Sequence, residues 1–120
     1  WMHFMRVGDV ELENMKKAAA HFVGEHDFTS FMSSGSSITD AVREVFAFDA
    51  EKIGDVLELR VSANGFLYNM VRIIAGTLIR VGRGFYEPER VKEILEAKER
   101  TEAGVTAPAH GLMLMEINYQ

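Results

Sequence analysis

The chain has 120 residues, of which 48% are hydrophobic, and it carries no cysteine and a formal net charge of −5 at pH 7. This length predicts one domain with a substantial core, and the missing cysteines exclude disulfides and zinc–thiolate sites. The apolar runs are too short to span a membrane, and a cysteine-free composition suits the reducing cytoplasm, where we expect the protein to act.

Charge is unevenly distributed along the chain. Residues 1–59 hold five Lys or Arg against eleven Asp or Glu, whereas residues 60–100 hold eight against five. Surfaces that bind nucleic acid usually gather more cations than this. Charge alone therefore gives only a weak indication of an RNA partner.

The first elements are a strand and a helix. Residues 1–7 are apolar and aromatic enough for a strand, and a chain that begins inside a strand suggests a piece of a longer protein. Apolar residues follow the helical spacing between 10 and 23. Asp9 is the expected N-cap of that helix, and Gly24 is its expected stop.

A polar stretch and a hairpin come next. Residues 25–40 are rich in Ser and Gly, so we expect an exposed loop that Phe28 and Phe31 pin down. Residues 42–48 and 56–63 alternate as strands, and the residues between them form the connection, with Gly54 supplying the turn.

The second half of the chain opens with its most apolar stretch, "GFLYNMVRIIAGTLIRVG". It predicts a buried helix over 66–82 that Gly82 and Gly84 terminate. Pro88 marks the first turn of another amphipathic helix. Residues 112–119 read as the last strand.

The order of these elements, β–α–β–β–α(–α)–β, indicates an α+β fold. It is the order of the split β-α-β, or ferredoxin-like, arrangement: a four-stranded antiparallel sheet with helices packed on one face. No repeat or linker divides residues 1–120, so we expect a single domain.

The usual catalytic and metal-binding patterns are weak. His21, His26 and Asp27 are close in sequence, but the helix stop between the two histidines argues against a metal site. No Ser/His/Asp pattern or phosphate-binding glycine loop stands out. We therefore expect no metal ligand set in this chain.

One residue of the apolar helix is out of place. Arg72 keeps its charge, and burying an unpaired guanidinium costs several kcal/mol. Helical spacing places it on a stripe with Tyr68 and Asn69 before it and the small Ala75 and Gly76 after it, so that another segment can approach closely. Arg72 then either reaches solvent or an acid of this domain, or pairs with a carboxylate on another domain or chain.

The segments that carry a family resemblance cover nearly the whole chain. They resemble, in order and spacing, the C-terminal half of the tRNA pseudouridine synthase A family: "GEHDFTSF" (24–31), "ANGFLYNMVRIIAGTLIRVGRG" (63–84), "ILEAKER" (94–100) and "AGVTAPAHGLMLMEINY" (103–119).

The resemblance implies an activity and a site. Such enzymes isomerise uridine to pseudouridine in the anticodon stem-loop of tRNA without metal or organic cofactor, and act as homodimers. It implies that Arg72 is the ion-pair partner of a catalytic Asp in the N-terminal half and that Leu112 forms a pocket wall near the target base. Tyr68 and Asn69, on the stripe of Arg72, are candidates for substrate binding.

The expected Arg-Thr-Asp-Gly type segment with the nucleophile is missing from residues 1–120, as is the pocket tyrosine. We therefore interpret the chain as a C-terminal half, inactive by itself, that contributes one wall of a cleft to an N-terminal catalytic domain. The alternative is a non-catalytic ferredoxin-like module that binds RNA or dimerises through its sheet.

Overall fold

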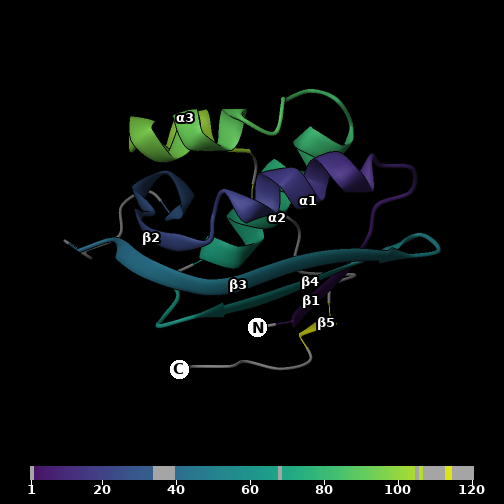
Figure 1. The fold of residues 1–120 in the computed structure, drawn as a ribbon, viewed down its shortest axis with the longest axis horizontal. Coiled ribbons are helices and arrows are strands. Elements are labelled where there is room, and N and C mark those ends of the chain that lie inside the picture. Colours follow the sequence, from purple (N-terminus) through teal and green to yellow (C-terminus); the bar gives the residue numbers. More distant parts are fainter. Residues whose placement is uncertain (1, 34–39, 68, 105, 107–112, 115–120) are drawn as a thin grey trace.

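The computed structural model describes residues 2–33, 40–67, 69–104, 106 and 113–114. They form one antiparallel sheet with three helices on one of its faces (Figure 1). The strands lie in the order β2-β3-β4-β1-β5, with these bounds: β1 Met2–Arg6, β2 Gly24–Asp27, β3 Val42–Ile53, β4 Val56–Ala63 and β5 Met113–Leu114. The α+β class is confirmed, but the predicted count of four strands is wrong, because β2 adds a fifth at one edge.

The stretch 25–40 differs most from its prediction as an exposed polar loop. Its described part holds most of β2 and a short 3₁₀-helix, η1 (Thr29–Phe31), while residues 34–39 lie outside the described residues. Phe28 and Phe31 are fully buried and pack around Phe22, with ring centroids 6.4 and 5.1 Å from it. The anchoring role predicted for these phenylalanines is confirmed, and their burial holds the polar residues between them in regular structure.

The β3–β4 hairpin is longer than its sequence suggested. Asp49–Ile53, predicted as part of the connection, belongs to β3, and Asp49 lies opposite Arg60. The turn is confined to Gly54 and Asp55, and Gly54 has a φ of +60° that glycine adopts readily. Cross-strand pairing thus extends the strand through residues whose polarity predicted a loop.

The helices are shorter than their apolar patterns: α1 is Leu12–Ala20, α2 is Met70–Gly82 and α3 is Arg90–Ala97, followed by the 3₁₀-helix η2, Arg100–Glu102. The N-cap of α1 is Glu11 rather than the predicted Asp9, and the predicted stop Gly24 lies in β2. The predicted end of α2 at Gly82 is confirmed. Among the described residues, no helix is long and apolar enough to cross a membrane.

Helix α2 lies at the centre of the core. Ten of its thirteen residues are buried, and it packs against α1, where the site of a Cβ on Gly82 would lie 2.6 Å from the sulfur of Met15. Each large side chain that is fully buried contributes about 1.5–3 kcal/mol relative to an exposed one. This burial makes α2 a rigid support for any group that it carries.

Candidate functional site at the start of helix α2

The first turn of α2 begins from an unusual backbone conformation. Asn69, the residue before the helix, has a φ of 59°, in the left-handed region, and its carbonyl accepts a hydrogen bond from the backbone N–H of Ile73 at 2.9 Å. Asparagine tolerates this region better than most residues do. Met70 and Ile73 are fully buried, so the turn is fixed to the core.

Arg72 is half-buried on this turn. Its Nη1 donates a hydrogen bond to Oδ1 of Asn69 at 3.3 Å, and Nδ2 of Asn69 donates to Oγ of Ser33 at 3.0 Å. The Asn69 side chain therefore links the Arg72 guanidinium to the end of the segment that follows η1. A planar guanidinium that is oriented in this way can bind a carboxylate through two parallel hydrogen bonds.

The small residues after Arg72 do receive a close neighbour. The backbone of Gly104 approaches α2 so tightly that a Cβ there would lie 2.8 Å from the backbone nitrogen of Thr77 and 2.9 Å from the carbonyl carbon of Gly76. The Gly104 N–H donates to Oγ1 of Thr77 at 2.9 Å, and this hydroxyl donates to the carbonyl of Ile73 at 3.0 Å. Neither Thr77 nor Gly104 was identified from the sequence, where the small Ala75 and Gly76 were the signal of close packing.

Arg100 holds the same segment from the other side. Its Nη1 donates to the carbonyl of Gly104 at 2.9 Å, and its Nη2 donates to Oγ1 of Thr106 at 3.2 Å. Gly104 is thus attached both to α2 and to η2, and Thr106 to η2. Sequence reasoning also missed Arg100, because nothing in its local pattern shows contacts beyond its own turn.

Two of the predicted site residues, Tyr68 and Leu112, lie outside the described residues.

The weak metal pattern of His21, His26 and Asp27 gains no support, since no group of three or more potential ligands forms within the described part of the chain. His26 Nε2 instead lies 3.1 Å from the carbonyl of Val23. The hydroxyl of Thr29 donates to Asp27 at 2.5 Å, and this bond, aided by the Thr29 backbone N–H, lowers the pKa of Asp27.

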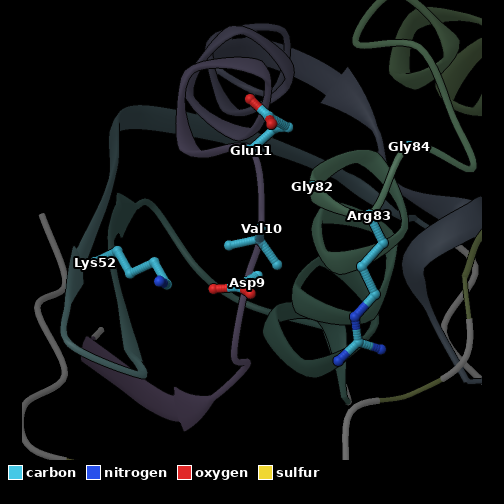
Figure 2. A pocket seen from close by; sticks show the side chains of 7 residues that line it. All are labelled: Asp9, Val10, Glu11, Lys52, Gly82, Arg83 and Gly84. Carbon is cyan, nitrogen blue, oxygen red and sulfur yellow. The ribbon is translucent and has the colours of Figure 1, made fainter.

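A pocket of about 520 Å³ lies at the opposite end of α2 (Figure 2). Lys52 reaches toward it from the β3–β4 hairpin, and Arg83 extends from the end of the helix. The pocket is lined by Asp9, Val10, Glu11, Lys52, Gly82, Arg83 and Gly84. Its two acidic and two basic side chains favour neither sign of ligand charge, so its composition does not identify a ligand.

Comparison with known proteins shows the family of the chain. The sequence model of the tRNA pseudouridine synthase family matches residues 18–120, a range that contains the whole of α2. The chain belongs to the tRNA pseudouridine synthase family. The family resemblance seen in the sequence is thereby confirmed.

The chain is similar to several bacterial members of this family. It is 48% identical over 110 residues to tRNA pseudouridine synthase A of Bacillus pumilus (strain SAFR-032), and 50% identical over 110 residues to that of Thermoanaerobacter sp. (strain X514). Identity to tRNA pseudouridine synthase A of Bacillus subtilis (strain 168) is 47% over 110 residues. Each match covers 92% of this chain but only 44 to 45% of the relative, so the chain spans less than half the length of these proteins.

Proposed function

We propose that the full-length protein containing this chain is a tRNA pseudouridine synthase that isomerises uridine to pseudouridine in the anticodon stem-loop. This chain supplies one wall of the active-site cleft. The observation that carries the proposal is Arg72, half-buried on the first turn of α2 and oriented by Asn69, within a chain of this family. The same proposal includes a ferredoxin-like relation of strands β3-β4-β1-β5, which the strand order supports and to which β2 is an addition.

In this proposal Arg72 pairs with the catalytic aspartate of the N-terminal half. The aspartate forms a bond to the ribose carbon as the bond from that carbon to the uracil nitrogen breaks. Uracil C5 then bonds to the same ribose carbon, which releases the aspartate, and C5 loses its hydrogen as a proton while the freed nitrogen gains one. A carboxylate in a dry pocket tends to take up a proton, which removes its nucleophilicity. The adjacent guanidinium lowers the pKa of the aspartate and keeps it ionised at neutral pH.

The other proposed contacts surround the target base. Such enzymes turn the base out of its stack, because its reacting atoms are inaccessible in the stack. Leu112 forms an apolar wall near the base, and Tyr68 contacts the substrate beside Arg72. Asn69, which we expected to bind substrate, has its amide engaged with Arg72 and Ser33 and supports the guanidinium as well.

The proposed partners are tRNA, the N-terminal catalytic domain of the same chain and a second copy of the full-length protein. The reaction rearranges bonds within one nucleotide and changes no oxidation state, so we propose no metal or cofactor. Residues 1–120 by themselves are inactive in this proposal, because the nucleophile lies in the other half.

The test is pseudouridine formation by the full-length protein on tRNA labelled with tritium at uracil C5. The new glycosidic bond at C5 displaces the tritium, so its release measures turnover. Arg72→Ala is expected to lower the rate about 100-fold or more, and Arg72→Lys to restore part of it, since lysine keeps the charge but loses the planar fork. A rate for Arg72→Ala within about twofold of the wild type would refute the role of Arg72.

The pH profile gives an independent check. Removing the guanidinium raises the pKa of the catalytic aspartate, so the acidic limb of the rate profile moves to higher pH in Arg72→Ala. A full-length protein that binds tRNA but releases no tritium would instead be the non-catalytic RNA-binding or dimerisation module.

A further inference from the structure

We propose that Arg100 is a positioning residue for pseudouridine formation, because it bonds Thr106 and holds Gly104 against the helix that carries Arg72. We call Gly104 and Thr106, with their contacts to Arg100 and Thr77, the α2 clamp. The inference rests on the proposed function and assigns to Arg100 an indirect role, through Gly104 and Thr106, rather than contact with the substrate.

The clamp holds the Gly104 peptide from two sides. Its N–H is bonded to Thr77 in the core of the molecule, and its carbonyl is bonded to Arg100. A Cβ at this position would collide with backbone atoms of α2, which cannot move as the end of a flexible side chain can. Hydrogen bonds and close contact therefore fix the position of Gly104 along the helix.

The backbone next to Arg100 is itself held in place by hydrogen bonds. Arg100 begins η2, and the residue before it, Glu99, donates its backbone N–H to Oγ of Ser30 at 2.9 Å. This fully buried hydroxyl donates in turn to the carbonyl of Ile94 at 2.6 Å. The backbone from which the Arg100 side chain extends is thus bonded to η1, and η1 is bonded to α3.

The clamp reaches the neighbour of Arg72 through two hydrogen bonds. The Gly104 N–H is bonded to Thr77, and the Thr77 hydroxyl donates to the carbonyl of Ile73, the residue after Arg72 on α2. Loss of the Arg100 contacts therefore lets Gly104 shift against the part of α2 that carries Arg72, and displacements of about 1 Å near a reacting centre can cost about 100-fold in rate.

The geometry uses what is particular to arginine. Two different guanidinium nitrogens reach two acceptors, the Gly104 carbonyl and the Thr106 hydroxyl. The single ammonium of lysine lacks this fork. Arg90 is a matched control, because it also contacts η2 but does so through Glu102, and it makes its other ion pair with Glu93.

The experiment compares Arg100→Met with Arg90→Met in the full-length protein, by tritium release per folded molecule and by tRNA binding. Arg100→Met is expected to lower kcat about tenfold or more with little change in the dissociation constant for tRNA, and Arg100→Lys to recover it in part. Arg90→Met should stay within about twofold of the wild type. Thr106→Val added to Arg100→Met should lower kcat little further, since the two residues share one contact.

Backbone hydrogen exchange at Gly104 in the same full-length variants tests the clamp without relying on catalysis. Arg100→Met and Thr77→Val should accelerate exchange of this amide about tenfold, and Arg90→Met should not. Unchanged exchange overturns the clamp. Faster exchange with an unchanged kcat overturns the positioning role. A wild-type protein that releases no tritium overturns the proposed function, while the exchange result still decides the clamp.

Discussion

The two ends of helix α2 both carry an arginine, and they differ in what that arginine contacts. At the start, Arg72 is half-buried and bonded to the side chain of Asn69, whose backbone is left-handed. At the end, Arg83 is exposed and donates to the carbonyl of Val7 at 3.4 Å, beside the tightly packed Gly82.

The difference teaches that the pocket and the oriented arginine lie at opposite ends of one helix. The pocket of Figure 2 lies at the end of α2, and its two acidic and two basic side chains do not identify a ligand. The start of the helix has a sparsely populated backbone conformation, which is frequent at functional sites, beside an oriented guanidinium. We therefore expect substitutions at the start of α2 to affect the reaction and those at the end to affect folding.

The largest expected effect contrasts the two arginines directly. In the full-length protein, Arg72→Ala lowers tritium release about 100-fold or more, because it removes the proposed partner of the catalytic carboxylate. Arg83→Ala leaves the rate within about twofold, since it loses one long hydrogen bond at the surface. If Arg72→Ala and Arg83→Ala lowered the rate of tritium release equally, the two ends of α2 would not differ in function.

Gly82→Ala should be a stability variant. The added Cβ meets the sulfur of Met15 at 2.6 Å and the Cβ of Val10 at 3.0 Å, so the unfolding free energy falls by about 1–3 kcal/mol. Gly84→Ala, with open space around it but a φ of +84°, costs about 1 kcal/mol. Urea unfolding measures both. A lower rate per folded molecule in Gly82→Ala would contradict the purely structural role of this end.

Asn69 allows backbone conformation and hydrogen bonding to be separated. Asn69→Ala loses the bonds to Arg72 and Ser33 and keeps the left-handed backbone, whereas Asn69→Gly loses the same bonds without backbone strain. Asn69→Gly should therefore be about 1 kcal/mol more stable than Asn69→Ala, while both lose about tenfold in rate. A rate that recovers together with stability in Asn69→Gly would mean that Asn69 acts on folding alone.

The smallest effect concerns acid stability, which has to be known before the pH dependence of the rate is interpreted. Thr29 lowers the pKa of Asp27 below its usual 3.8, so Asp27 contributes stability above that value, and the contribution is lost as pH falls through the lower folded-state pKa. Asp27→Asn should thus lower the urea midpoint slightly at neutral pH and converge with the wild type in acid. A constant difference at every pH would indicate lost packing rather than lost charge.

Local pattern predicted the main elements of this chain and misjudged their ends. The apolar run before Gly82 correctly predicted α2, and alternation correctly predicted the β3–β4 hairpin. The prediction of a loop failed over 25–31, where the polar neighbours of buried phenylalanines lie in β2 and η1. The polarity of a stretch indicates only its average environment, whereas here a few large buried side chains fixed the backbone conformation.

The candidate site divides in the same way. Arg72 could be found from the sequence because a charge inside an apolar helix is conspicuous at one position. Thr77, Arg100 and Gly104 could not, because their contacts join residues far apart in the chain: 27 positions separate Gly104 from Thr77. The predicted roles of Tyr68 and Leu112 stay predictions.

The amino-acid sequence by itself determined the family, the α+β class and the arginine to examine, since these depend on residue order and on the cost of placing a charge among apolar neighbours. Tertiary structure decided that Asn69 orients Arg72 and that Gly104 lies against α2. Such relations depend on hydrogen-bond geometry and on packing to within a few tenths of an ångström, and both exist only once distant segments have folded together.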